Sequence, residues 1–298
     1  MINYVSFIGI GFIIGVLSGL FGVGGGFLLV PLLNVVFNIP YNIAIGSSLC
    51  QMVGTSSAAS LKHKGYGNID YKLAMFILMG SIGGTEFGAR ILMWLKSIGN
   101  VVIRSSTVSK MDLWINIIFI VLLSLVGISM FLESKKAKKR APRGGVVDTI
   151  FSQKIQNITI PPLTFLPISK VKSISIWNLI CLGFVVGMLS GFLGIGGAFI
   201  MNPALIYLIG VPTSIAIGTS LFQTIFISGY GALTHFFKGN VDFALVVYIL
   251  LGSLIGSQLG AKIHNKLRGA DIRYYFSLVI FIATGIVLFK FLFRIGYL

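Results

Sequence analysis

One glycine-rich stretch occurs twice in the chain, each time inside a strongly apolar segment. The first copy, residues 19–31, reads GLFGVGGGFLLVP, and the second, residues 191–203, reads GFLGIGGAFIMNP. A run of glycines is costly inside a helix. In lipid, a broken helix is tolerated only where protein or a water-filled cavity covers the freed backbone groups. Such breaks at matching positions of two halves are typical of a carrier's binding site, so we expect two broken helices that face one substrate.

The duplication extends well beyond these glycines. A shift of 172 residues aligns 11–91 with 183–263 without a gap. The matched pairs include polar residues, prolines and further glycines: Ser18/Ser190, Pro31/Pro203, Pro40/Pro212, Gly46/Gly218, Ser48/Ser220, Gln51/Gln223, His63/His235, Asp70/Asp242 and Gly88/Gly260. Gene duplication is the direct interpretation, and two equivalent halves are expected to meet at a pseudo-two-fold axis.

Composition places the chain in the membrane. Of 298 residues, 56% are hydrophobic and only 10% are charged, with a mean hydropathy of +0.97. A soluble domain carries roughly 25% charged residues, so we predict an all-α polytopic membrane protein. The net charge of +16 would suggest a nucleic-acid partner in a soluble chain. Here the basic residues lie between apolar segments, and topology and anionic lipid headgroups explain them better.

The apolar segments define the expected helices, at about 3–37, 41–61, 71–95, 112–132, 174–209, 213–237, 241–263 and 273–296. A spanning helix needs about 20 residues. The first and fifth segments are too long for one crossing, and each is better divided at its glycine motif. Eight hydrophobic segments therefore predict about ten helical pieces.

We expect two transmembrane repeats, 1–133 and 173–298, joined by a linker at 134–172. The linker holds KKAKKR at 135–140, and the positive-inside rule predicts that it is cytoplasmic in a multi-pass protein of the inner or plasma membrane. Four crossings in each half would make the repeats parallel, and five would make them inverted. The distribution of Lys and Arg fits both. We favour inverted repeats, because the fifth piece otherwise has no clear place.

Three features make each glycine motif a candidate anion site. Consecutive glycines can expose N–H groups in a concave nest, and the helix that follows points its positive N-terminal end at the same spot. The next segment adds hydroxyls and an amide, of which those three residues apart share a helix face. The candidate substrate-binding residues are Gly24, Gly25, Gly26, Ser47, Ser48 and Gln51, with Gly196, Gly197, Ala198, Asn202, Thr219, Ser220 and Gln223. Close helix packing is the alternative role for the glycines.

Two polar residues break the symmetry between the halves. Asn202 stands where the first half has Val30, and either shapes the site or makes an interhelical hydrogen bond. Tyr230, opposite Ala58, is a similar candidate.

Glu86 is the only acidic residue well inside a predicted span. Intramembrane carboxylates are functional candidates by default, so Glu86 could couple transport to protons. Arg90, four residues later, makes a structural ion pair the alternative. The matching residues are Gln258 and Lys262, so only the first half has the acid.

His63 and His235 precede Gly-Asn-Ile-Asp and Gly-Asn-Val-Asp, where Asp70 and Asp242 are expected to cap helices. We therefore expect both histidines in interfacial loops. Cys50 and Cys181 do not occupy equivalent positions. No catalytic triad, carboxylate pair or metal-binding cluster stands out, so we expect no enzyme, cofactor or metal. No nucleotide-binding motif is present, and energy would come from an ion or substrate gradient, with a proton or sodium as possible coupling ion.

The duplicated motif, followed by Ile-Ala-Ile-Gly-Ser/Thr-Ser-Leu-x-Gln at 43–51 and 215–223, resembles the TauE/SafE sulfite/sulfonate transporter family, which includes toluenesulfonate uptake permeases. The resemblance covers nearly all of 5–95 and 177–296. It implies a prokaryotic-type inner-membrane carrier of sulfur-containing anions such as sulfite, sulfoacetate, taurine-like compounds or aryl sulfonates. The motif positions it implicates are Gly24, Gly25, Gly26, Ser48, Gln51, Gly196, Gly197, Ser220 and Gln223. Ala198 departs from the pattern and makes the two nests unequal.

The leading hypothesis is a secondary transporter of small sulfur-containing organic anions, bound near the midplane between the two glycine breaks. Movement of one half against the other would give alternating access. Two alternatives stay open: an anion channel with the same glycines as a filter, and a membrane enzyme or assembly factor of sulfur metabolism in which the helices serve only as a scaffold.

Overall fold

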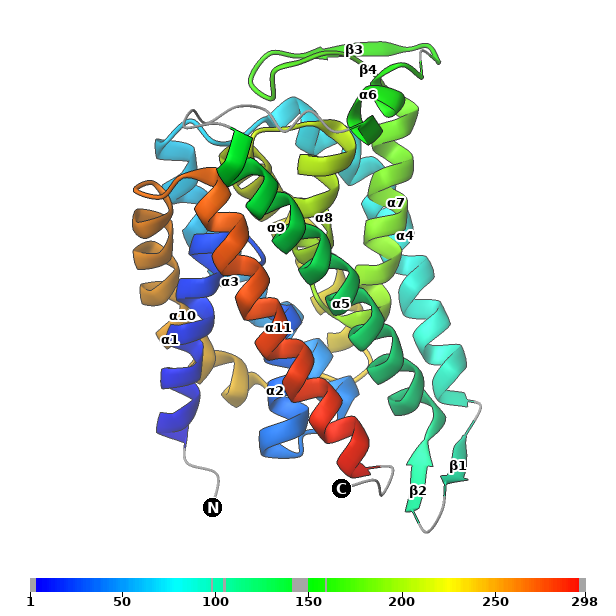
Figure 1. Cartoon of the computed structure of the whole chain (residues 1–298). Coiled ribbons are helices and arrows are strands. Elements are labelled where there is room, and N and C mark those ends of the chain that lie inside the picture. Colours follow the sequence, from blue (N-terminus) through cyan, green and yellow to red (C-terminus); the bar gives the residue numbers. More distant parts are fainter. Residues whose placement is uncertain (1–3, 98, 104–105, 141–149, 159, 295–298) are drawn as a thin grey trace.

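The computed structural model describes residues 4–97, 99–103, 106–140, 150–158 and 160–294. Nearly all of this part is helical, which confirms the all-α polytopic class. Two small antiparallel hairpins lie at opposite ends of the helical bundle (Figure 1). They are formed by β1 (Asn100–Ile103) with β2 (Ser106–Ser109), and by β3 (Leu163–Leu166) with β4 (Val171–Ser175).

Each half contributes five helices to the described bundle. The first half has α1 (Tyr4–Phe21), α2 (Gly26–Phe37), α3 (Tyr41–Gly65), α4 (Tyr71–Ser97) and α5 (Lys110–Arg140). The second half has α7 (Ile176–Leu193), α8 (Ala198–Ala204) with its π-helical continuation η1 (Leu205–Ile209), α9 (Thr213–Phe236), α10 (Phe243–His264) and α11 (Gly269–Arg294). Both long segments are divided at their glycine motifs, as predicted. Five helices of the described chain are long and apolar enough to cross a membrane, and α1 and α8 with η1 are shorter apolar helices.

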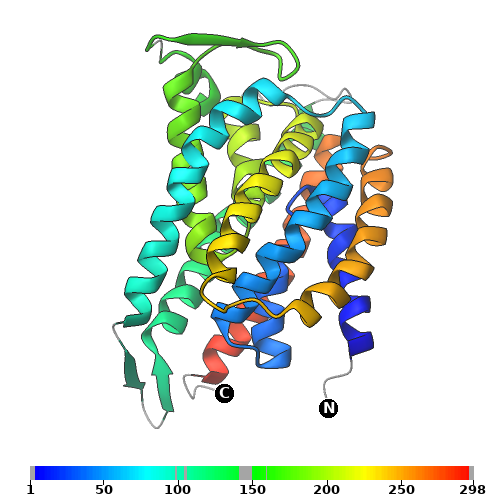
Figure 2. The ribbon, with the colours of Figure 1, turned by 180° about the vertical axis from the view of Figure 1, so that it is seen from behind.

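The two broken helices come into the bundle from opposite ends. In Figure 1, α1 rises from the end that carries both chain termini, and α2 returns to that end. The helix α7 starts at the other end, beside the β3–β4 hairpin, and α8 returns there (Figures 1 and 2). Because each pair turns back inside the bundle, the glycine segments lie in its interior.

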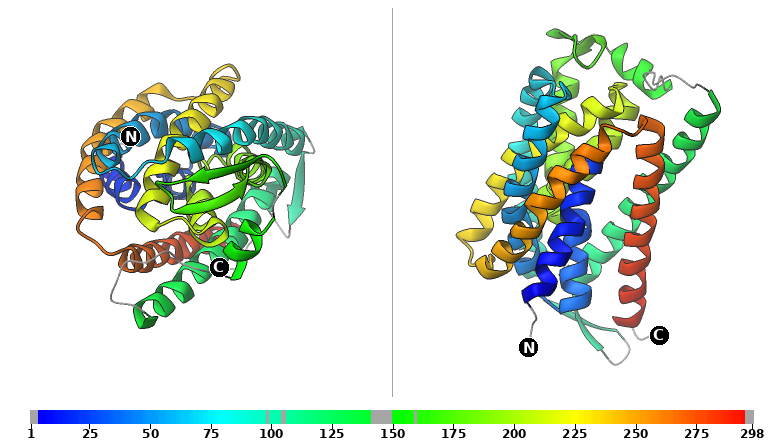
Figure 3. Two further views of the ribbon diagram at one scale, coloured as in Figure 1. Left: turned by 90° about the horizontal axis from the view of Figure 1, so that it is seen from above. Right: turned by 90° about the vertical axis from the view of Figure 1, so that its left-hand side faces the viewer.

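The halves are interlocked through glycine-lined helix faces. The helix α10 lies along α1 (Figure 3), and α7 lies along α4. On α1 and α10, a Cβ added to any of six glycines would come within 3.0 Å of the backbone of the facing helix: Gly11, Gly15, Gly19, Gly252, Gly256 and Gly260. The same holds on α4 and α7 for Gly80, Gly84, Gly88, Gly183, Gly187 and Gly191. Small residues let membrane helices approach closely, so these glycines set the distance between the halves.

The starts of α4 and α10 are capped as the sequence predicts. Leu73 N–H donates to Asp70 Oδ1 at 3.0 Å, and Leu245 N–H donates to Asp242 Oδ1 at 3.1 Å. Each cap also contacts the other half, because Asp70 N–H donates to Thr219 Oγ1 and Asp242 N–H donates to Ser47 Oγ. Thr219 and Ser47 therefore position helix starts across the interface.

Part of the region predicted as the linker, residues 134–172, forms regular secondary structure. The helix α5 continues to Arg140 and includes the basic run at 135–140, because Lys, Arg and Ala favour helix and cations suit a helix C-terminus. Residues 141–149 lie outside the described part. Beyond them come α6 (Ile150–Gln156) and the β3–β4 hairpin, which docks on α4: Ser169 Oγ donates to Asp70 Oδ2 at 2.7 Å and Lys72 Nζ to the Phe165 carbonyl at 3.1 Å.

Candidate binding site at the glycine crossing

The two glycine segments, residues 22–26 and 194–197, meet inside the bundle, and we call this place the glycine crossing. A Cβ added to Gly26 would lie 3.1 Å from the Gly194 carbonyl oxygen. Gly22, Gly24 and Gly25 have φ between 70° and 90°, and Gly194, Gly196 and Gly197 have φ between 68° and 78°. Side chains rarely tolerate this left-handed region. The motif is thus needed for the sharp turns that end α1 and α7.

The central helices α3 and α9 line the crossing. The Met52 side chain of α3 fills it, because its Cε would lie within 3.0 Å of a Cβ at either Gly24 or Gly196. Its counterpart on α9, Thr224, donates from Oγ1 to the Gly196 carbonyl at 3.3 Å. A methionine thioether is flexible and readily repacks, so the centre is occupied by a side chain that can move.

Two serine hydroxyls at the crossing are buried and unpaired. Ser56 Oγ lies 3.3 Å from the Cβ position of Gly24, and Ser228 Oγ lies 2.9 Å from that of Gly196. Both serines are 0% exposed, and neither hydroxyl has a hydrogen-bond partner among the described residues. Leaving a buried hydroxyl unpaired costs about 1–3 kcal/mol. Two hydroxyls from equivalent positions are therefore free to bind a ligand.

The start of α2 adds backbone donors at the same place. The first N–H groups of a helix have no partner within it, and the N-terminus carries the positive end of the dipole. α2 begins at Gly26, its N-cap Gly25 offers no side chain, and its first turn has no acidic residue. With Ser56 and Ser228 nearby, the crossing presents neutral donors, and neither α2 nor the two glycine segments contains an Asp or Glu, which suits an anion.

Of the predicted polar residues, Ser48, Ser220 and Asn202 lie at the crossing. Ser48 Oγ is 3.2 Å from the Cβ position of Gly26. Asn202 Nδ2 donates to the carbonyls of Phe21 at 2.8 Å and Gly22 at 3.1 Å, and its Oδ1 accepts from Ser220 Oγ. Asn202 thus ties α8 to the end of α1, which confirms the interhelical hydrogen bond that the sequence left open.

The two glutamines face other helices. Gln51 Nε2 donates to Thr55 Oγ1 and, at 2.8 Å, to Ser253 Oγ on α10. Gln223 Nε2 donates to the Ala74 carbonyl on α4 at 3.3 Å. Their Oε1 atoms are buried without a partner in the described chain. The structure therefore brings Ser48 and Ser220 to the glycines but aims both glutamines at the interface between the halves.

Sequence reasoning missed Met52, Ser56, Thr224 and Ser228. The signal was present, because residues four apart on a helix share a face. Extending that series from Ser48 gives Met52 and Ser56, and the matching series on α9 runs through Ser220, Thr224 and Ser228. Gln51 does not belong to this series and instead faces α10.

The expectation of loop histidines is wrong. His63 is 0% exposed on α3 and His235 is 3% exposed on α9. The helices continue to Gly65 and Phe236, so both rings lie on a last helical turn and face inward.

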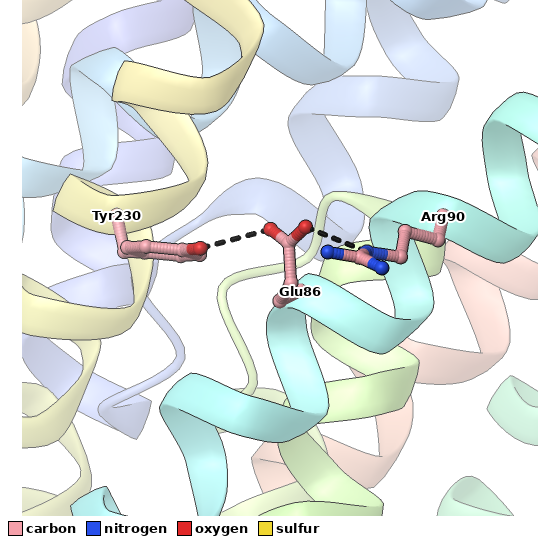
Figure 4. A network of polar contacts seen from close by, with 3 residues as sticks. All are labelled: Glu86, Arg90 and Tyr230. Atoms are coloured by element: carbon pink, nitrogen blue, oxygen red, sulfur yellow. Dashed lines mark hydrogen bonds and ion pairs between the residues drawn. The ribbon is translucent and has the colours of Figure 1, made fainter.

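Glu86 bridges two helices from different halves (Figure 4). Its Oε1 pairs with Arg90 Nε at 2.8 Å, and its Oε2 accepts from the Tyr230 hydroxyl of α9 at 2.8 Å. The ion pair that the sequence offered as an alternative is confirmed. The equivalent contact in the other half is neutral, with Gln258 Nε2 donating to the Ala58 carbonyl at 2.9 Å. Equivalent helix pairs are thus joined in both halves: α4 to α9 through the Glu86 carboxylate, and α10 to α3 through the neutral Gln258 amide.

We expect Tyr230 to stabilise Glu86 more than Arg90 does. Arg90 is 71% exposed, so solvent screens its pair with Glu86, whereas the hydrogen bond from Tyr230 to the carboxylate is partly buried and is screened less. Double-mutant cycles on thermal unfolding in detergent, with Glu86→Gln paired with Tyr230→Phe and then with Arg90→Gln, measure both couplings. A larger coupling to Arg90 would contradict this ranking.

Comparison with known proteins agrees with these features. The family model described as "Sulfite exporter TauE/SafE" matches residues 7–288. The "Probable membrane transporter protein YunE" of Bacillus subtilis (strain 168) is 27% identical over 91% of this chain and 92% of that protein. YdhB of the same organism, also a "Probable membrane transporter protein", is 25% identical over 85% and 87%.

A plant protein shares a shorter region. The "Sulfite exporter TauE/SafE family protein 3" of Arabidopsis thaliana is 29% identical over 35% of this chain and 21% of that protein. No solved structure matches the chain. Since the family model spans both glycine motifs and nearly every helix, this chain belongs to the sulfite exporter TauE/SafE family of membrane transporters.

Proposed function

We propose that the protein is a secondary transporter of small sulfur-containing organic anions of the sulfonate, sulfinate or sulfite class. The observation that carries the proposal is the pair of unpaired hydroxyls, Ser56 and Ser228, at the crossing of two glycine breaks. Sulfonate and sulfite oxygens accept several hydrogen bonds at once. The family description and the motif resemblance supply the sulfur chemistry.

In this proposal the anionic head takes the place of the Met52 thioether. It accepts hydrogen bonds from Ser56, Ser228 and the N–H groups that begin α2, with Ser48 at the edge of the site. Asn202 and Ser220 hold the end of α1 in place. The glutamines do not contact the anion in this proposal. Gln51 holds α3 against α10, and Gln223 holds α9 against α4.

Alternating access follows from the proposed arrangement of the halves. Broken helices that come in from opposite ends support inverted repeats related by a pseudo-two-fold axis. Rocking of one half against the other would open the crossing first to one side and then to the other. The basic end of α5 and the β3–β4 hairpin would face the cytoplasm. For Glu86 and Arg90, the geometry supports a structural ion pair rather than ion coupling.

Thermal unfolding of the purified protein against a panel of anions tests the proposal. The panel holds sulfite, thiosulfate, sulfate, taurine, hypotaurine, sulfoacetate, toluenesulfonate and chloride. A ligand at 100 times its Kd stabilises the folded state by about 2.7 kcal/mol, so we expect one sulfur anion to raise the melting temperature selectively. A flat response from folded protein, or an equal rise with chloride, would contradict a sulfur-anion site.

The channel alternative is separated by exchange in proteoliposomes. A carrier swaps internal for external labelled substrate and saturates, whereas a channel gives unitary currents and no exchange. Saturable exchange of the anion that stabilises the protein is the expected result.

A further inference from the structure

Two buried histidines from different halves lie side by side at the end of α1. His63 is on α3 and His264 is the last residue of α10, and their ring centroids are 4.8 Å apart. Their exposed fractions are 0% and 1%. Both helices end on the side of the bundle that carries the β3–β4 hairpin (Figures 1 and 2).

Both rings bind the last turn of α1, directly before the first glycine break. His63 Nε2 lies 3.0 Å from the Gly19 carbonyl oxygen, and His264 Nδ1 lies 2.8 Å from that of Leu20. A carbonyl only accepts, so each of these nitrogens donates. The other nitrogen of each neutral ring then carries a lone pair. These atoms, His63 Nδ1 and His264 Nε2, are buried and have no partner in the described part of the chain.

The helices that carry or contact the two rings offer no negative charge to a protonated ring. The three helices that pack around the pair, α1, α3 and α10, contain no Asp or Glu between their described bounds. Lys62 and Lys64 on α3, Lys262 on α10 and Lys266 just after it are exposed and are close to the two histidines in sequence, and the Tyr66 ring lies 6.4 Å from the His63 ring. α1 carries no charged residue. A proton taken up here therefore gains no acceptor within the described part of the chain and no counter-charge from these three helices.

We propose that His63 and His264 form the proton-binding site that couples transport to a proton gradient. Proton uptake makes a cation with an N–H that has no acceptor in the closed bundle, so it favours a state in which water or the substrate anion reaches the ring. Because both rings hold α1 just before Gly22, that change acts on the glycine crossing. This inference rests on the proposed function and names its coupling ion.

The third histidine provides a matched control. His235 occupies the position equivalent to His63, but the residue equivalent to His264 is Leu92, so His235 has no histidine counterpart there. The proton site is therefore expected at only one end of the molecule.

Chemically matched variants test the proposal in proteoliposomes. His63→Gln keeps a donor at the position of Nε2, and His264→Asn keeps one at that of Nδ1, while both remove titration. The probe is radiolabelled toluenesulfonate, whose sulfonate stays ionised. We expect wild type and His235→Gln to accumulate it when the outside is more acidic. The double variant should exchange it at a similar rate but accumulate it at least about 10-fold less.

Two results would overturn the proton site while leaving the transporter intact: accumulation by wild type that ignores the pH gradient, or gradient-driven accumulation by the double variant. If wild type exchanges no toluenesulfonate, the ring nitrogens are titrated by NMR in the purified protein. Coupled signals from His63 and His264 that change together as the pH is lowered, before the protein unfolds, support the site. Ring signals that titrate independently of each other, or that do not change before acid unfolding, overturn it.

Discussion

Alanine at Gly84 should strongly destabilise the protein, whereas alanine at the neighbouring Gly83 should not. A Cβ at Gly84 would come within 3.0 Å of the Phe184 carbonyl and Met188 N, both backbone atoms of α7, while a Cβ at Gly83 meets nothing within 4 Å. Backbone cannot move aside as a flexible side chain can. Separating α4 from α7 also breaks the hydrogen bond from Ser81 Oγ to the Gly183 carbonyl, 3.1 Å long.

We expect Gly84→Ala to cost about 3 kcal/mol and Gly83→Ala to stabilise by up to about 1 kcal/mol through helix propensity. The melting temperatures of the two variants in detergent measure this difference in stability, and size-exclusion chromatography shows whether each variant stays folded. The two variants carry the same added methyl group on adjacent residues. Equal melting temperatures would show that α4 and α7 do not pack at the distance seen here.

Removing both central hydroxyls should abolish most substrate binding without destabilising the protein. Each hydrogen bond to an anion contributes about 1.5–3 kcal/mol, so Ser56→Ala with Ser228→Ala should raise the Kd or KM about 100-fold or more. Neither hydroxyl has a partner among the described residues. The ligand-free double variant should therefore be at least as stable as wild type.

Ser57→Ala is the matched control on the same helix. Ser57 Oγ donates to the Val53 carbonyl at 2.7 Å and is half-buried, so its loss should leave substrate affinity unchanged. An unchanged KM in the double variant, or a double variant less stable than wild type, would mean that the two serines serve packing instead.

Much of this architecture could be predicted from the sequence because it depends on local rules. The glycine runs at 22–26 and 194–197 end α1 and α7 because several of these glycines adopt positive φ. Asp70 and Asp242 cap the starts of α4 and α10. Each of these patterns occurs twice in the sequence, at matching positions of the two halves. The class of membrane protein follows from composition alone.

The orientation of side chains within α3 and α9 could not be predicted in the same way. From the sequence of α3 alone, Ser48 and Gln51 are expected on the same face of the helix. In the structure α10 packs beside Gln51, and the Gln51 amide donates to Ser253 of α10. That choice depends on a helix about 200 residues away. The pairing of His63 with His264 is also a contact between halves, and it joins positions that the repeat does not relate.

The interlocked glycine faces have a consequence for how the chain is made in the membrane. α1 packs against α10, and α4 packs against α7. Helices α1 and α4 of the first half therefore cannot complete their packing until the second half has been inserted. Glycine faces on the newly made first half have no tightly fitting surface within that half. During synthesis the first five helices would therefore be inserted without the partners of α1 and α4, and lipid or an insertion factor would cover these two glycine faces. Expression of the two halves as separate polypeptides would need both in the same membrane for either to resist proteolysis.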